Sequence, residues 1–163
     1  MPTVSNTSPI SNLAWIGRLN LLHEQFSYVW IPQAVETELG NIPDVTVVKT
    51  LGESKDAGWI KTRPVTNVNL VTLLMGELHQ GEAEAIALGL EMKADRLLID
   101  EREGRAMARQ LGLPLTGVLG VLLRAKKMKR LTAIKPEIEK LKTKARFFIA
   151  PALETSVLEK AGE

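Results

Sequence analysis

A short apolar run near the middle of the chain, Arg96 to Asp100 (RLLID), constrains the fold more than any other segment. It places three large aliphatic residues in a row, which is typical of a strand that is buried on both faces. A polar turn and a helical pattern from Gly104 to Leu111 follow it directly. Because such a strand needs helices on both sides, the run predicts an α/β protein with a largely parallel sheet.

The rest of the chain alternates between strand-like and helix-like segments. Thr7, Ser8 and Pro9 predict a helix start, since Ser or Thr before proline is common there. With right-handed crossovers, the alternation predicts a three-layer α/β/α sandwich with a central, mainly parallel sheet. Further strands are expected at 3–5, 28–31, 59–63 and 115–116. Helices are expected as a short pair after Pro9, after Pro32, at 71–78, at 82–90 following a break at Gln80 and Gly81, and at 117–127. Residues 41–66 are expected to be the least regular part of the chain.

Length and composition predict a single domain. The chain has 163 residues, of which 45% are hydrophobic and only 4% aromatic, a balance that suits a parallel sheet covered by helices. We expect one domain over 1–163, with a core at 1–130 and a helical extension at 131–163. That extension carries helical patterns at 135–144 and 151–161.

Several classes of protein are excluded at this stage. Cysteine is absent, which excludes disulfides, cysteine nucleophiles and thiolate zinc sites and agrees with a reducing compartment. The sequence contains neither an apolar stretch long enough for a membrane span nor an N-terminal leader pattern. We therefore expect a soluble, cytoplasmic protein with no membrane partner.

Four polar residues stand near the predicted ends or starts of strands and helices: Asn6, Glu38, Glu82 and Asp100. The carboxyl edge of a parallel sheet is where such side chains meet and where ligands usually bind. Oxygen donors without His or Cys select Mg²⁺ or Mn²⁺. We expect all four residues to hold the cation and the three acids to be catalytic. For Glu38, spacing alone leaves a solvated glutamate as the alternative.

Other chemistries have weaker support in the sequence. His23 and His79 lack partners at catalytic or metal-binding spacing, so each is expected to be a surface or helix residue. There is no phosphate-binding loop and no dinucleotide fingerprint. A basic run is a candidate nucleic-acid contact, with a solvated helix end as the alternative. Its members are Lys126, Lys127, Lys129 and Arg130.

Three segments together resemble a known superfamily. They are VSNTSPISNLAWIGRLNLL, IPQAVETEL, and the long stretch from GEAEAIALG through LLIDEREGR to TGVLGVLLRAKK. In that order they resemble the PIN-like domain superfamily, and in particular a branch described as predicted nucleic-acid-binding proteins. The resemblance covers almost the whole chain. It implies an α/β/α fold and a Mg²⁺- or Mn²⁺-dependent ribonuclease, in many members the toxin of a toxin–antitoxin pair.

Residue roles also follow from the resemblance. Thr7 and Ser8 would orient the first site residue or a water molecule, and Glu101 and Glu103 would add acids beside the fourth. We expect Arg105 to pair with a site carboxylate. The resemblance further implies single-stranded RNA as substrate, a small antitoxin-like partner and a homodimer.

Asn6 departs from the superfamily pattern, which usually has Asp at this position. The amide keeps an oxygen donor but loses a charge, so we expect weakened activity and higher metal affinity in Asn6→Asp. The alternative function is a non-catalytic PIN-like module that binds nucleic acid or protein. A phosphatase ranks last, because it requires an early aspartate nucleophile.

Overall fold

The computed structural model describes residues 2–163, and its centre is a five-stranded sheet in which every pairing is parallel. The strand order is β3-β2-β1-β4-β5. This confirms the predicted α/β class and parallel sheet. The strands are β1 (Thr3–Ser5), β2 (Val29–Ile31), β3 (Ile60–Thr62), β4 (Arg96–Leu98) and β5 (Leu115–Thr116).

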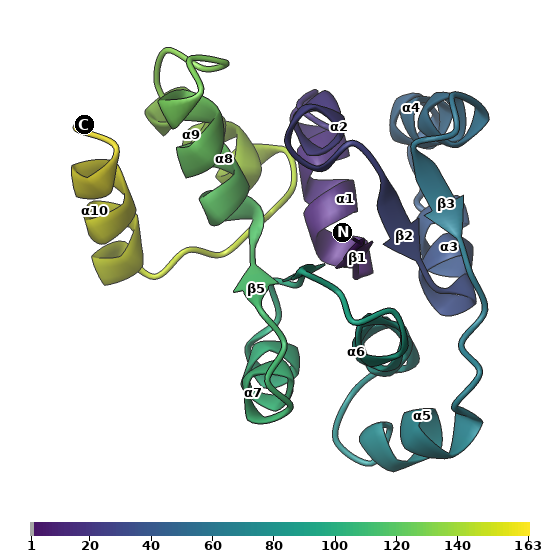
Figure 1. Cartoon of the computed structure of the whole chain (residues 1–163). Helices are drawn as coiled ribbons and strands as arrows, with labels where there is room; N and C mark the ends of the chain where they lie inside the picture. Colours follow the sequence, from purple (N-terminus) through teal and green to yellow (C-terminus); the bar gives the residue numbers. More distant parts are fainter. Residues whose placement is uncertain (1) are drawn as a thin grey trace.

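Helices cover both faces of the sheet. Figure 1 shows α5, α6 and α7 on one side and α1, α2 and α8 on the other, with β1 in the middle of the sheet. The helices are α1 (Thr7–Trp15), α2 (Asn20–Phe26), α3 (Gln33–Gly40), α4 (Val45–Asp56), α5 (Val68–Leu74), α6 (Gln80–Glu91), α7 (Arg102–Gln110), α8 (Val118–Lys127), α9 (Lys135–Thr143) and α10 (Pro151–Lys160).

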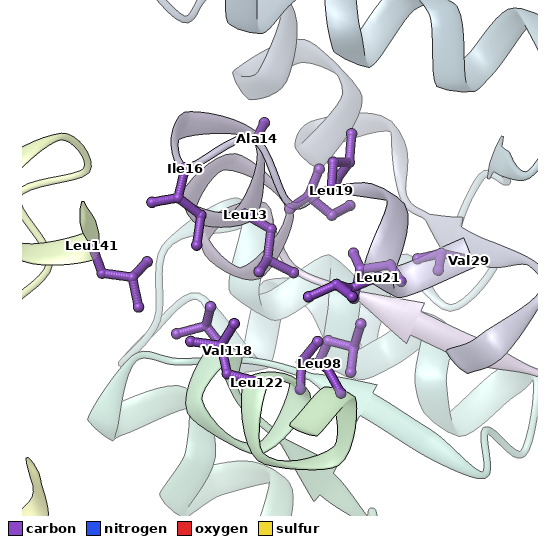
Figure 2. Close-up of a cluster of buried hydrophobic side chains, with 14 of the residues drawn as sticks. Leu13, Ala14, Ile16, Leu19, Leu21, Val29, Leu98, Val118, Leu122 and Leu141 are labelled. Atoms are coloured by element: carbon purple, nitrogen blue, oxygen red, sulfur yellow. The ribbon is translucent and has the colours of Figure 1, made fainter. Parts of the chain in front are cut away.

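The interior strand β4 explains why the sheet is covered on both faces. Leu97 and Ile99 pack into the cluster formed with α5, α6 and α7, whereas Leu98 packs into the cluster on the opposite face. All three side chains are fully buried. Figure 2 shows Leu98 close to Val118 and Leu122 of α8, with α1 residues completing the cluster. The prediction that RLLID forms a strand buried on both faces is confirmed.

Two predictions of local structure were wrong. Residues 41–66 are not mainly irregular, because α4 occupies twelve of them. Asp44 caps this helix by accepting a hydrogen bond from the Val47 amide at 2.9 Å, and Val47 and Leu51 face the core. The expected break at Gln80 and Gly81 is also absent, since both residues belong to the first turn of α6.

The C-terminal helices differ in how deeply they pack. Ile138 and Leu141 of α9 are fully buried in the same cluster as Leu98, and Glu137 receives a hydrogen bond from Arg18 at 2.9 Å. Helix α10 buries only Val157 and lies at the outer end of the molecule in Figure 1. Among residues 2–163, none of the helices combines the length and apolar composition that crossing a membrane requires.

Candidate metal centre

The strand order places a crevice at one point of the sheet. From β1 the chain proceeds outward to β2 and β3, then returns to add β4 and β5 on the other side of β1. The carboxyl ends of β1 and β4 therefore flank the topological switch point, where ligands bind in open α/β sheets. Asn6 directly follows β1, and its backbone N–H donates to the Leu98 carbonyl at 2.9 Å.

A cavity of about 180 Å³ opens beside this switch point, and we call it the acidic pocket. Its polar lining comes from the start of α1, from α3, from the start of α6 and from the residue before α7. The lining residues are Asn6, Thr7, Ser8, Glu38, His79, Glu82 and Glu101. Three of the four residues predicted as ligands therefore meet in one cavity.

Asn6 and Glu101 form a direct pair in this pocket. Asn6 is 2% exposed, and its Nδ2 donates to Glu101 Oε2 at 2.9 Å. The Ser8 hydroxyl donates to the other oxygen of Glu101. Within residues 2–163, Oδ1 of Asn6 is buried and has no hydrogen-bond partner. The opposite amide orientation would set a carbonyl against a carboxylate, so this pairing leaves Oδ1 as the acceptor that still needs a partner.

Glu38 reaches the pocket across a glycine. The Thr7 hydroxyl donates to Glu38 Oε2, which ties α3 to the first turn of α1. A Cβ atom added to Gly81 would collide with Oε1 of Glu38. A glycine at the start of α6 is therefore required for the close approach of this carboxylate. The solvated alternative for Glu38 is half correct, since the residue is exposed overall while its carboxylate lines the pocket.

Glu82 is the most buried acid of the pocket at 6% exposure. It accepts a hydrogen bond from the backbone amide of His79 at 3.1 Å, at the N-terminus of α6. Burial raises the pKa of Glu82, an effect that the charge of Glu101 increases and the His79 amide opposes. A cation bound beside Glu82 would relieve both the burial penalty and the repulsion.

Asp100 lies outside the acidic pocket, although it lines a neighbouring cavity together with Glu101. Its Oδ1 accepts from the Val118 amide at 2.9 Å, at the first turn of α8. Gly117 leaves room for this contact, because a Cβ atom there would meet Asp100 Oδ1 at 2.5 Å. Asp100 lines two neighbouring cavities that include residues from α8 and the 144–150 segment. Its Oδ2 is buried without a hydrogen-bond partner in the described part of the chain.

The surroundings of Asp100 raise the pKa of its carboxyl group. Burial raises the pKa of Asp100 to about 6, and the charge of Glu101 acts in the same direction. The Val118 amide and the Arg105 guanidinium oppose the shift. Arg105 donates to the Ile99 carbonyl at 2.8 Å, so its charge lies beside Asp100. Within residues 2–163 Arg105 forms no ion pair, so its expected pairing with a site carboxylate stays a prediction.

The remaining predicted residues lie outside the acidic pocket. Glu103 is exposed on the first turn of α7. The basic run is at the far end of α8, roughly 14 Å along the helix from Val118 at 1.5 Å per residue. Lys126 binds Glu163 at 2.9 Å, and Arg130 binds Glu24 at 3.3 Å. These pairs favour the solvated helix end, and the RNA contact stays a prediction.

His79 is the pocket residue that sequence reasoning missed. It was expected to be an unspecialised surface or helix residue, and it is indeed exposed. It is also the N-cap residue of α6 and lines the pocket beside Glu82. Its position two residues before the GEAE motif was the available signal, because the residue before a helix shares the surroundings of the first helical turn.

The donor set of the pocket fits a hard divalent cation. Within residues 2–163, no group of three or more acidic, histidine or cysteine side chains is arranged so that it could hold a metal ion. Mg²⁺ does not need one, because it keeps several waters and usually binds one or two carboxylates. The unpartnered Asn6 Oδ1 and the raised pKa of Glu82 are the two observations that favour a cation here.

Comparison with known proteins agrees with this fold. A family model described as a PIN domain (DUF3368) matches residues 2–163. Among solved structures, the chain is similar to the PilT N-terminus domain protein SSO1118 from the hyperthermophilic archaeon Sulfolobus solfataricus P2. The TM-score is 0.56 at 19% identity, covering 77% of this chain and 93% of the other, a likeness that concerns the fold alone. No curated protein matches the sequence closely enough to carry an assignment.

The family match spans all the described residues, so the chain belongs to the PIN-domain family. PIN domains are in general metal-dependent nucleases. The resemblance inferred from the sequence motifs is thereby confirmed.

Proposed function

We propose that this protein is a divalent-metal-dependent ribonuclease that hydrolyses single-stranded RNA. The observation that carries the proposal is the acidic pocket at the switch point of the sheet, where Asn6, Glu38, Glu82 and Glu101 meet. Family membership supports a nuclease in general. The RNA substrate and the choice of Mg²⁺ or Mn²⁺ belong to the proposal.

Glu82, Glu101, Glu38 and the Asn6 carbonyl oxygen are the groups that would hold the cation. When bound, such an ion lowers the pKa of a coordinated water and neutralises charge on a phosphodiester. The hydroxyls of Thr7 and Ser8 hold Glu38 and Glu101 in the pocket. The His79 amide fixes Glu82 at the start of α6. The chain thus orients each oxygen donor through a separate hydrogen bond.

Asp100 has a different role in this proposal. Its contact with the Val118 amide satisfies one of the unpaired N–H groups at the start of α8. We assign it to positioning the end of β4, which carries Glu101 toward Asn6. A direct role of Asp100 in metal binding stays a prediction from the family pattern.

Cleavage of an unstructured RNA with Mn²⁺ tests the proposal. Wild type should cleave, and Glu82→Gln should lose most of the rate, because it removes a buried carboxylate that would hold the cation. Glu77→Gln is the matched control, since it removes the same charge from an exposed position outside the pocket. Equal cleavage by wild type and Glu82→Gln would contradict the proposal and indicate a contaminating nuclease.

The rival function is a PIN module that binds RNA without cutting it, and Asn6 is the observation that favours it. An amide at this position contributes less negative charge than the carboxylate usual in the superfamily. Absence of cleavage by wild type, together with retention of RNA on a filter, would support the rival. A role as the toxin of a toxin–antitoxin pair stays a prediction from the resemblance and would need a partner protein to be identified.

A further inference from the structure

The segment that joins α9 to α10, residues 144–150, lies next to the acidic pocket. A cavity of about 270 Å³, which we call the loop cavity, is lined by Arg146 and Phe148 of this segment and by Ser8 and Glu101. Ser8 and Glu101 also line the acidic pocket. The two cavities therefore adjoin through a shared wall.

The segment is held firmly on both sides of its most exposed side chain. The Phe147 amide donates to the Leu141 carbonyl at 2.9 Å, and the Phe147 ring packs against the main core cluster. Ile149 is buried at 6% exposure. Between these anchors Phe148 is 84% exposed, the most exposed phenylalanine in the described chain. Phe147 and Ile149 thus fix the backbone on both sides of Phe148, and the Phe148 ring points into solvent.

Cationic charge accompanies this ring. Arg146 is exposed and lines the loop cavity, and Lys144 is exposed two residues earlier. Within residues 2–163, neither side chain makes an ion pair. An unpaired arginine beside an exposed aromatic ring matches the two features that single-stranded nucleic acid recognises: phosphate charge and a face on which a base can stack.

We propose that Phe148 and Arg146 form a binding subsite for single-stranded RNA, in which Phe148 stacks on a base and Arg146 contacts a phosphate. The proposal rests on the proposed function, because it places this nucleotide next to the phosphate that lies in the acidic pocket. The exposed Phe148 ring and the unpaired Arg146 select RNA as the occupant, although Asp100 and Glu101 also line the loop cavity. The neighbouring carboxylates would repel a polyanion unless a cation and basic side chains such as Arg146 offset them.

The test is the affinity of the protein for a fluorescently labelled single-stranded RNA, measured by anisotropy in Ca²⁺, which offsets the carboxylates, with the RNA shown on a gel to be uncut. Phe148→Ala should weaken binding by about 5- to 150-fold, the range for loss of one base–aromatic stack. Phe148→Trp should retain binding. Tyr28→Ala is the matched control, since Tyr28 is 53% exposed and precedes β2, which lies on the other side of β1 from β4 and β5.

The salt dependence of binding separates the two side chains. Arg146→Ala should reduce the slope of log K against log salt by about 0.7, the value for one phosphate contact on a single strand. Phe148→Ala should leave the slope unchanged. An unchanged slope in Arg146→Ala would remove that residue from the subsite.

Failure of this inference is distinguishable from failure of the proposed function. If Phe148→Ala binds RNA as tightly as wild type, or Tyr28→Ala is equally weakened, the subsite is overturned even where Glu82-dependent cleavage is observed. If Phe148→Ala weakens binding but no metal supports cleavage, the subsite stands and the nuclease does not. No RNA binding by wild type overturns the subsite as well.

Discussion

Glu101 and Asp100 are adjacent in sequence, yet they occupy two regions of different design. Glu101 lies in the acidic pocket, where the Asn6 amide and the Ser8 hydroxyl donate to it. Asp100 lies against the start of α8, where the Val118 amide donates to it and Gly117 makes room. We call this second region the α8 niche.

The donors in the two regions explain why their roles differ. In the acidic pocket the donors to Glu101 are the Asn6 and Ser8 side chains, and Asn6 Oδ1 has no hydrogen-bond partner within residues 2–163. In the α8 niche the donor is a backbone amide fixed by the helix. Each region also leaves one buried oxygen without a hydrogen-bond partner in the described chain, Asn6 Oδ1 in the pocket and Asp100 Oδ2 in the niche, so the difference lies in the backbone amide that holds Asp100.

The largest expected effect concerns the pH dependence of stability in the α8 niche. The folded protein holds the Asp100 proton up to about pH 6, whereas an ordinary aspartate releases it near 3.8. The folded state therefore binds more protons within that window, and stability falls as pH rises through it. The contribution is at most about 3 kcal/mol. Urea unfolding in EDTA should show Asp100→Asn losing less stability than wild type between pH 4 and pH 7.

The control for this experiment is Asp95→Asn, an exposed aspartate before β4. It should follow the wild-type profile. Parallel profiles for wild type and Asp100→Asn would show that Asp100 is not the group responsible.

The second prediction compares the two neighbours directly as metal ligands. Glu101→Gln should weaken Mn²⁺ binding by about 10- to 100-fold, the range for losing a group that orients or binds a metal. Asp100→Asn should change the affinity much less, because Asp100 faces the α8 niche. Isothermal titration calorimetry of both variants measures the difference. A greater loss in Asp100→Asn would assign the ligand role to Asp100 and reverse the comparison.

The third prediction uses two glycines of α6. Gly81→Ala adds a methyl group that collides with the Glu38 carboxylate, so Mn²⁺ affinity should fall by about tenfold. Gly89→Ala is the matched control, because its added carbon meets Leu113 only at an ordinary 3.5 Å. Both changes favour helix by about 0.5 to 1 kcal/mol, so neither should lower the melting temperature much. Equal Mn²⁺ affinities of Gly81→Ala and Gly89→Ala would show that Glu38 does not bind the metal.

The smallest expected effect belongs to Asn6→Asp. An aspartate would set its carboxylate against Glu101 Oε2, which now accepts a hydrogen bond at 2.9 Å. Without metal the variant should lose about 1 kcal/mol of stability, and Mn²⁺ should restore it while binding more tightly than to wild type. Thermal unfolding with EDTA and with Mn²⁺ measures both effects. Asn6→Ala serves as the control that removes the oxygen donor altogether.

The sheet and part of the pocket were predictable because short-range patterns determine them. The RLLID run identified β4 as a strand buried on both faces, and Asn6, Glu38 and Glu82 were placed at one edge from their positions beside predicted strands and helices. Helix α4 was missed because Thr46, Gly52 and the β-branched Val47 and Val48 weaken its helical appearance. Its identity depends on the Asp44 cap and on tertiary burial of Val47 and Leu51.

The choice between Asp100 and Glu101 was not predictable from the sequence. Both acids follow β4, and which of them turns toward Asn6 depends on where α7 and α8 begin in space. The roles of His79 and Phe148 depend in the same way on distant segments meeting. Local sequence preferences predict the strands, but they do not predict which distant segments come into contact.

The proposed function requires that oxygen atoms of the acidic pocket share one divalent ion. A crystal structure of the Mn²⁺-soaked protein tests this most directly. We predict an anomalous manganese peak within ligand distance of Glu82, Glu101 and Asn6 Oδ1. A peak in the α8 niche at Asp100 alone, or no peak at saturating Mn²⁺, would contradict it.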